Sequence, residues 1–273
     1  MQNGQTATHG LIRLFAWEQL HNDGLQKTLP LVQGSRWFAA LTRNIYTVWD
    51  AFCDDRENGN DWIVTEPVRA IEGIGNKGTG LYQRFVGVRE FFVIGAETRQ
   101  AVFQRYGYTR PGYGTISPDS PLQTSEGTHS SFVTADHSLV DFYVDVLGLE
   151  VVGGGSKISG WKNPSTRQTL MLEEGQEFVF SVFTSPGAVA GVFQVYSPLY
   201  PTEDKRDQAQ PGSLGLSLFT YQVEDLAALH TRVSGSNATR VSPIANNEFG
   251  EASFGFFAPD GMYWVILEKS SDD

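Results

Sequence analysis

The stretch between residues 126 and 150 changes from a strand-like pattern to a helical one. Its first part, Thr128–Thr134, is short and β-prone, and turn residues bound it on both sides. Apolar side chains then recur at helical spacing and form one stripe, at Leu139, Phe142, Tyr143, Val146 and Leu147. We therefore predict a strand, a helix that Ser138 caps and that ends at Gly148, and a second strand from Leu149.

The same succession of elements recurs on both sides of this stretch. Towards the C-terminus the pattern predicts a strand, a helix and three strands, at Leu216–Val223, Asp225–Val233, Arg240–Ile244, Ala252–Phe257 and Met262–Glu268. Towards the N-terminus it predicts a strand, a helix and a last strand, at Trp37–Thr42, Ile45–Phe52 and Arg99–Tyr106. The chain therefore contains an internal repeat of βαβββ type, with units at about residues 35–106, 128–197 and 214–269.

Further strands and one linker complete the predicted layout. Leu11–Trp17 predicts a strand before the first unit, and Arg167–Leu172 and Glu177–Thr184 predict paired strands within the second. Residues 107–127 hold three prolines and four glycines, which prevent a long regular element. We place a domain boundary there and expect two domains, at residues 1–118 and 119–273.

Two phrases of the sequence resemble those of a known family. They are EGTHSSFVTADHSLVDFYVDVLGLE at residues 126–150 and FGFFAPDGMYWVILE at residues 254–268. Both are similar to segments of the vicinal oxygen chelate superfamily, which includes glyoxalases, extradiol dioxygenases and bleomycin-resistance proteins. The resemblance implies an α+β fold of repeated βαβββ modules that pair into cup-shaped mixed β-sheets. It implies no single reaction, because this fold carries lyases, isomerases, dioxygenases and proteins that only bind.

The repeat also predicts which units pair with one another. We expect the second and third units to close one cup and to form the C-terminal domain. The first unit then lacks a full partner, because only Leu11–Trp17 precedes it. An unpaired curved sheet exposes its edges and an apolar face. Either a second copy of the chain or sequence upstream of Met1 would cover it, and we favour the second copy, which makes the protein a homo-oligomer.

Composition narrows the class of partner. The formal net charge of −11 argues against nucleic acid and anionic membranes as partners. The single cysteine rules out a disulfide within the chain and suggests a reducing, cytoplasmic location. No apolar run approaches the roughly 20 residues that a membrane helix needs. A small organic molecule, apolar or aromatic, is the expected ligand.

The resemblance also implies where a metal would bind. In metal-dependent members the ligands lie on the first and last strands of the paired modules, and His129, seven residues before Asp136, matches one such position. Gln194 on the last strand of the second unit is a weak ligand. The other corresponding positions hold apolar side chains that cannot bind a metal, at Trp37, Val102, Leu218 and Val265. We therefore expect no metal and no other cofactor.

Without a metal, the candidate catalytic residues are polar side chains of the predicted cup. We expect His129 to act as a general acid or base, because its ordinary pKa lies near neutrality. Tyr263 and Gln194 are candidates for orienting the substrate or donating a proton. For both His129 and Tyr263 a purely structural role stays open. The expected substrate-binding residues are Trp37, Val102, Tyr196, Leu218, Thr220 and Val265.

Three functions agree with these observations. The first is a metal-independent lyase or isomerase that uses acid–base chemistry at His129. The second is a protein that binds and sequesters an aromatic or drug-like compound without changing it. The third is a metal-dependent dioxygenase or glyoxalase-like enzyme that uses His129 as a ligand. Substitution of His129 separates the first two functions, and metal analysis separates the third.

Overall fold

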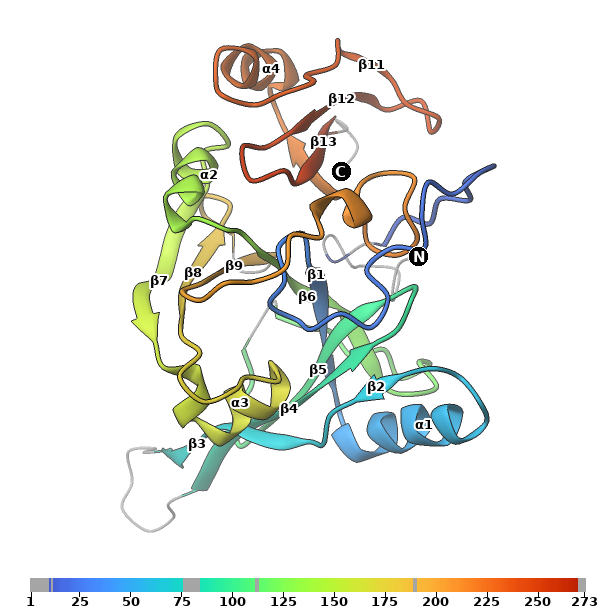
Figure 1. Ribbon diagram of the computed structural model, residues 1–273, viewed down its shortest axis with the longest axis vertical. Helices are drawn as coiled ribbons and strands as arrows, with labels where there is room; N and C mark the ends of the chain where they lie inside the picture. The colour runs from blue at the N-terminus through green and yellow to red at the C-terminus, as the bar shows by residue number, and fades with distance from the viewer. Residues whose placement is uncertain (1–9, 11, 76–83, 111–112, 189–190, 270–273) are drawn as a thin grey trace.

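The strands that the structure describes form two sheets, one of nine strands and one of four. The computed structural model describes residues 10, 12–75, 84–110, 113–188 and 191–269. The larger sheet occupies the lower part of Figure 1, and the smaller sheet lies above it with α4. Strands and helices occur in the same units, so the expected α+β class is confirmed.

All three predicted units are present and begin with a strand that leads into a helix or a helical turn. The first unit comprises β1 (Arg36–Thr42), α1 (Ile45–Glu57), β2 (Ile63–Val64), β3 (Val68–Gly75), β4 (Arg84–Ile94) and β5 (Arg99–Tyr106). The second comprises β6 (Thr124–Val133), η1 (His137–Val140), α2 (Asp141–Asp145), β7 (Glu150–Ile158), η2 (Gly160–Lys162), α3 (Pro164–Thr169), β8 (Phe178–Thr184) and β9 (Val192–Pro198). After η3 (Arg206–Ala209), the third comprises β10 (Phe219–Val223), α4 (Leu226–Ser234), β11 (Ala245–Asn246), β12 (Ala252–Phe257) and β13 (Tyr263–Glu268).

Polar side chains begin the helical segments of these units. Asn44 accepts a hydrogen bond from the amide of Tyr46 at the start of α1, and Asp225 accepts one from Ala228 in α4. In the second unit the cap is Asp136, which accepts from the amide of Ser138 at 2.9 Å. Our prediction that Ser138 caps this helix is therefore wrong by two residues, because a short 3-10 turn comes before α2.

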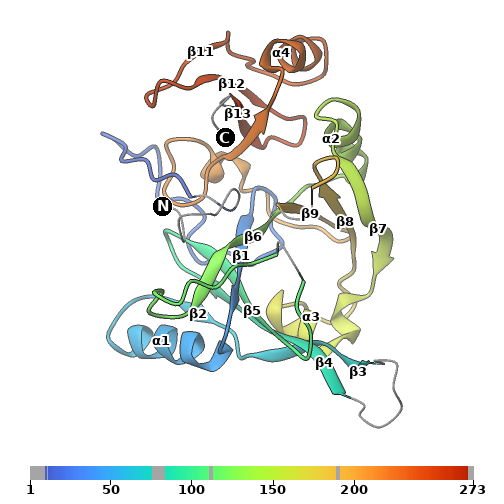
Figure 2. The ribbon, with the colours of Figure 1, turned by 180° about the vertical axis from the view of Figure 1, so that it is seen from behind.

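The units pair differently from our prediction. β1 of the first unit runs antiparallel to β6 of the second, with Ala39 opposite His129, so these two units share the nine-stranded sheet. Figure 2 shows β1 and β6 side by side at the middle of that sheet. The expected pairing of the second and third units is wrong, because β1 and β9 already occupy the two edges of β6.

This pairing gives the first and third units different surroundings from those we expected. The first unit is not short of a partner sheet, so our reason for a homo-oligomer no longer holds, and the oligomer stays a prediction. The third unit instead forms a separate four-stranded sheet, in the order β10-β13-β12-β11. The domain boundary that we placed after residue 118 falls in the connection between β5 and β6, and both of these strands belong to the larger sheet.

Three predicted strands do not form as expected. Arg167–Leu172 overlaps α3, which Asn163 caps by accepting from the amide of Thr166 and which begins at Pro164. Residues 12–16 have no regular secondary structure, and Leu11 lies outside the described residues. Residues 240–244 also lack a strand, and only Ala245–Asn246 pairs with β12. Tertiary contacts, rather than local propensity, decide these short segments.

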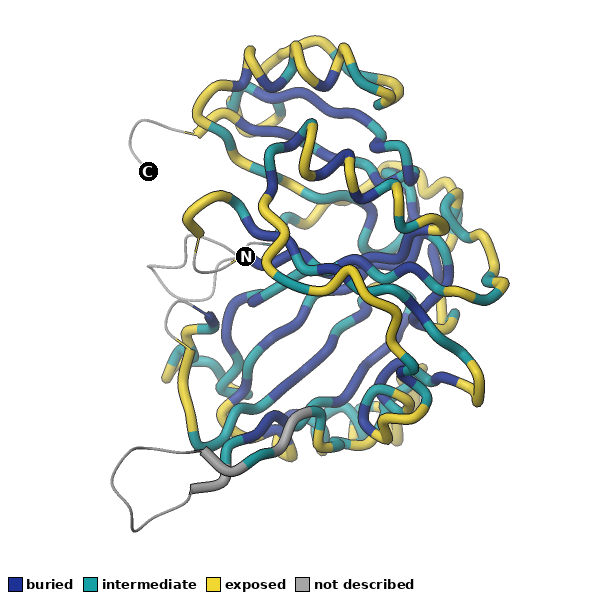
Figure 3. The backbone as a smooth tube through the Cα atoms, turned by 90° about the vertical axis from the view of Figure 1, so that its left-hand side faces the viewer, coloured by how far each residue is buried: buried dark blue, intermediate teal, exposed yellow. Residues whose placement is uncertain are grey.

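The apolar core lies in layers on the two faces of the larger sheet. One face packs against α3 and the segment after it through Trp37, Phe92, Leu170, Leu172 and Phe178. On the other face, the strands of the first unit pack against α1. The strands of the second unit pack there against α2, α4 and the smaller sheet, and together these elements form one apolar cluster. Figure 3 shows the central strands buried over much of their length. Among the described residues, none of the helices has the length and hydropathy to cross a membrane.

Candidate functional site

The face of the larger sheet that α3 covers carries several of the predicted site residues. We call it the inner face. α3 follows β7 at one end of the sheet and contacts β3 and β4 at the other, so the sheet curls around it. Trp37 on β1 and Gln194 on β9 both pair with Ser131 on β6, so the register places these side chains on the inner face. His129 and Tyr196 share it, because each lies two residues from Ser131 or Gln194 along its strand.

His129 lies among aromatic and hydroxyl groups. Its Nδ1 atom is 2.9 Å from the hydroxyl of Tyr113 and 3.0 Å from that of Thr128. The ring of Tyr113 stacks on the imidazole with a centroid distance of 5.9 Å. Burial, and after it the positive charges of Arg105 and Arg110, lower the pKa of His129 to about 3. The imidazole is therefore neutral at neutral pH.

Gln194 and Tyr196 form a second polar group on the same face. The Gln194 side-chain oxygen accepts hydrogen bonds from Ser131 Oγ at 3.2 Å and from Tyr196 Oη at 3.3 Å. These bonds fix the amide plane and leave its NH₂ group directed to other partners. The Tyr196 ring contacts three aromatic rings, at centroid distances of 5.2, 5.4 and 4.8 Å, which are Trp37, Phe178 and Phe180. Burial raises the pKa of Tyr196, so its phenol keeps its proton.

The inner face also holds a carboxyl group that sequence analysis missed. Glu90 on β4 pairs with Phe103 and shares a face with Phe92, and Ser165 of α3 donates a hydrogen bond to it at 3.3 Å. Burial raises the pKa of this carboxyl group. The charge of Glu90 in turn raises the pKa of Tyr196, so the two side chains lie close enough to interact across the curled sheet. A single acidic residue within the apolar stretch 84–94 was the signal that could have found it.

The remaining predicted residues lie elsewhere. Leu218, Thr220, Tyr263 and Val265 line a separate cavity at the smaller sheet. Val102 is fully buried under α1, on the face opposite His129, so our expectation that it binds the same substrate as His129 is wrong. We expected one site, and the structure divides its residues between two. The cause is the pairing of the first and second units, which separates Tyr263 from His129.

The residues around His129 do not fit the metal site of metal-dependent relatives. The neighbours of His129 in the register are Ala39 on β1 and Val192 on β9, which offer no donor side chain. No group of three His, Cys, Asp or Glu side chains gathers anywhere within the described ranges. A catalytic zinc ion commonly has three protein ligands. We therefore derive no step through a metal.

Comparison with known proteins establishes the family. Residues 131–266 match the model of the Glyoxalase/Bleomycin resistance protein/Dioxygenase superfamily. This part of the chain belongs to that superfamily. The match begins within β6 and ends within β13, so it covers the second and third units. The resemblance that the two sequence phrases indicated is confirmed. A search of curated proteins finds no match.

Several solved structures of the superfamily are similar to the chain. A glyoxalase family protein from Bacillus cereus has 18% identity and a TM-score of 0.42, and the match covers 50% of this chain and 89% of that one. Glyoxalase I from Zea mays has 12% identity and a TM-score of 0.46, with 85% and 66% covered. A putative dioxygenase from Bacillus subtilis has 12% identity and a TM-score of 0.47, with 89% and 65% covered.

Proposed function

We propose that this member of the superfamily is a lyase or isomerase that transfers a proton at the inner face without a metal. The observation that carries the proposal is the presence of Glu90 on the same face as His129, Gln194 and Tyr196. Burial moves the pKa of the carboxyl group up and that of the imidazole down. Pairs of groups with pKa values shifted in opposite directions are typical of acid–base sites.

The two shifted groups have different roles in this proposal. Glu90 removes a proton from a carbon atom next to a carbonyl group, because a carboxyl group with a raised pKa is the stronger base. His129 stays neutral, and its Nδ1 atom accepts a hydrogen bond from the Tyr113 hydroxyl, whereas the neighbouring Thr128 hydroxyl donates to the carbonyl oxygen of Ala39. Its proton is then on Nε2, from which it donates to the carbonyl oxygen as negative charge develops there.

The lining of the inner face supports an aromatic or apolar substrate. Trp37, Phe178, Phe180 and Tyr196 form a continuous set of ring contacts beside the amide of Gln194. Phe180 and Tyr196 are only partly buried, so they offer ring surface to a ligand. Ligand sites bind mainly through apolar area, and a few polar groups orient the ligand.

Deuterium exchange tests the proposal. A panel of aromatic ketones and aldehydes with acidic C–H groups is incubated with the protein in D₂O, and proton NMR follows loss of the C–H signal. We expect exchange by the wild type, and a loss of about a hundredfold or more in Glu90→Gln and in His129→Ala. Glu173→Gln, in an exposed turn, is the matched control. Unchanged exchange in Glu90→Gln would remove this residue from the mechanism.

Binding without chemistry is the second candidate function, and the same aromatic lining favours it. A binder holds a panel compound in the inner face but exchanges no proton. Saturation-transfer NMR with the same panel measures that binding directly. If Trp37→Ala weakens binding while Glu90→Gln and His129→Ala leave it unchanged, and no compound exchanges, the protein sequesters its ligand rather than transforms it.

A further inference from the structure

Among the described residues, no other βαβββ unit covers one face of the smaller sheet. Val265 of β13 lies opposite Thr220 of β10 and Gly255 of β12, so these three positions share that face. The N-terminal residues 12–17 lie along it and take the place of a partner unit. Together they enclose a cavity of about 290 Å³, whose walls include Arg13, Phe15 and Trp17 on one side and Leu218, Tyr263 and Val265 on the other.

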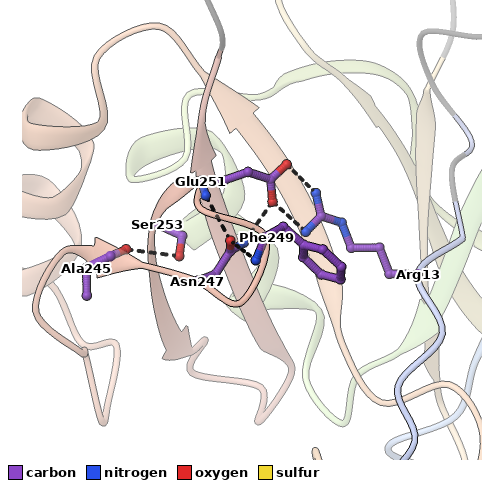
Figure 4. Close-up of polar contacts among 6 residues, drawn as sticks. All are labelled: Arg13, Ala245, Asn247, Phe249, Glu251 and Ser253. Atoms are coloured by element: carbon purple, nitrogen blue, oxygen red, sulfur yellow. Dashed lines mark hydrogen bonds and ion pairs between the residues drawn. The ribbon is translucent and has the colours of Figure 1, made fainter.

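A partly buried ion pair fastens the N-terminal segment to the third unit. The two terminal guanidinium nitrogens of Arg13 donate to the carboxylate of Glu251 at 2.7 Å, and Asn247 donates to the same carboxylate at 2.7 Å. Figure 4 shows this arrangement and the ring of Phe249 beside the guanidinium group, 5.0 Å from it. The hydrogen bonds from Arg13 lower the pKa of Glu251. The charges of Arg13 and Glu251 therefore neutralise each other at the cavity.

Two aromatic rings of the segment form one wall of the cavity. The rings of Phe15 and Trp17 stack with a centroid distance of 5.7 Å and an interplanar angle of 15°. They stay 37% and 40% exposed, respectively. Leu14 between Arg13 and Phe15 is 69% exposed and does not line the cavity. The extended segment thus turns alternate side chains, Arg13, Phe15 and Trp17, towards the sheet.

On the opposite wall of the cavity, the phenol group of Tyr263 lies over Gly255. A Cβ atom at Gly255 would lie 2.1 Å from Tyr263 Oη, so the Tyr263 side chain crosses β12 directly over this residue. Its ring also contacts Phe257 at 4.8 Å. Burial raises the pKa of Tyr263, which keeps the hydroxyl protonated. This hydroxyl makes no hydrogen bond to the part of the chain that the structure describes, so it is available to a ligand.

We propose that this cavity is a second binding site, for an uncharged, planar aromatic molecule that carries a hydrogen-bonding oxygen. The flat surface of Phe15 and Trp17 suits a planar ring. The Tyr263 hydroxyl provides the polar contact. The Arg13–Glu251 pair leaves no cation free for an anionic ligand, and the exposed Glu248, which also lines the cavity, repels one. The volume is near the lower end of about 300–1,000 Å³ for ligand pockets, which corresponds to a ligand of one or two rings.

Titration of the full chain with 2-naphthol tests this proposal. Two-dimensional ¹H–¹⁵N NMR reports the indole of Trp17 and the amide of Gly255 during the titration. We expect both signals to shift, and Trp17→Ala to weaken binding about tenfold through loss of the stacking surface. Leu14→Ala, in the same segment but outside the cavity, leaves the affinity unchanged. The anion 2-naphthoate binds at least about tenfold more weakly, because nothing here pairs with its charge.

A charge exchange tests the role of the ion pair. Arg13→Glu or Glu251→Arg alone places like charges together, and we expect a loss of 2-naphthol affinity of about tenfold. The double exchange restores most of that affinity, which separates loss of the contact from loss of folding. Unchanged affinity in Trp17→Ala, or shifts confined to residues around His129, would overturn the second site. If Trp17→Ala instead sediments as a smaller particle and keeps its affinity for 2-naphthol, the occupant of the cavity is a second copy of the chain. That result would also overturn the proposed binding site.

The two sites give distinguishable results. Glu90→Gln removes the proposed proton transfer at the inner face and leaves 2-naphthol binding at the smaller sheet unchanged. Trp17→Ala has the opposite effect on the two measurements. Either proposal can therefore fail while the other stands.

Discussion

The phenolic oxygen of Tyr143 lies 2.5 Å from Asp260 Oδ2, and both side chains are buried. Tyr143 belongs to α2 of the second unit, and Asp260 to the turn between β12 and β13 of the third. The other oxygen of Asp260 accepts from the amide of Met262 at 3.0 Å. This hydrogen bond is thus a specific polar contact within the apolar cluster that joins the two sheets.

Removal of this contact should loosen the third unit from the larger sheet. In Tyr143→Phe the buried carboxyl group of Asp260 keeps the Met262 amide but loses the phenol donor at Oδ2, and we expect a loss of about 1–3 kcal/mol in the free energy of unfolding. Urea denaturation followed by tryptophan fluorescence measures this loss. Tyr221→Phe is the control, because Tyr221 packs against the same cluster and its hydroxyl makes no hydrogen bond to the described part of the chain. An equal loss in both variants would contradict the prediction.

Glu90 should make the protein less stable as the pH rises. Its pKa in the folded protein is raised above the ordinary value of 4.5, so the folded state holds a proton that the unfolded state has already released. The favourable contribution is complete below pH 4.5 and is lost as the pH rises through the folded pKa. Glu90→Gln should lack this decline and match or exceed the wild type in stability at pH 7, while it loses proton transfer.

Urea denaturation of the wild type and Glu90→Gln between pH 4 and pH 8 checks this prediction. Glu173→Gln, which alters an exposed carboxyl group, should keep the wild-type profile. If Glu90→Gln instead follows the wild-type profile across the range, Glu90 ionises normally in the folded protein, and the proposed base loses its raised pKa.

The local elements could be predicted from sequence, because short-range patterns determine them. The alternation in β12 and β13 and the helical stripe of α2 contain the signal within a few residues. The pairing of units could not be predicted in this way. β6 and β10 begin similar units, and only the three-dimensional register shows that β6 joins β1 whereas β10 pairs with β13 alone.

The candidate site was predictable only in part for the same reason. His129, Gln194 and Tyr196 lie on neighbouring strands of one unit, so their positions within the repeat sufficed to bring them together. Glu90 is on another unit, and it approaches Tyr196 only because the sheet curls. Val102 was misassigned because its position in the repeat does not show which face of β5 it joins, and a shift of one residue exchanges the inner face for the face under α1. Long-range curvature and register decide such contacts.

His129 should have the opposite effect on stability to Glu90. Its pKa falls from 6.5 to about 3 in the folded protein, so only the unfolded state takes up a proton between these values. The contribution of neutral His129 is complete above pH 6.5 and is lost as the pH falls towards 3. His129→Gln should therefore lose less stability than the wild type between pH 7 and pH 4, as urea denaturation measures. His21→Gln is the exposed control, and a wild-type slope in His129→Gln would show that another group causes the acid sensitivity.

Arg105 should set both the pKa of His129 and a preference for anionic substrates. Arg105 and Arg110 each lie 4.5 Å from the ring of Tyr113, which stacks on His129. Neither forms an ion pair with a carboxylate among the described residues, although the chain has a net charge of −11. Two such cations beside a neutral imidazole attract a carboxylate on the substrate.

Arg105→Gln removes one of these charges and should raise the pKa of His129, because protonation of the imidazole then meets less repulsion. It should also weaken binding of 2-naphthoate at the inner face by about tenfold, since a charge-assisted contact is lost. NMR titration of the His129 ring protons measures the first effect, and shifts of the His129 and Gln194 signals with 2-naphthoate measure the second. Arg89→Gln is the matched control, because Arg89 also lies over an aromatic ring, that of Tyr46, but on the opposite face of β4 from Glu90. An unchanged His129 pKa in Arg105→Gln would show that burial alone holds the imidazole neutral, and the preference for an anionic substrate would then lose its support.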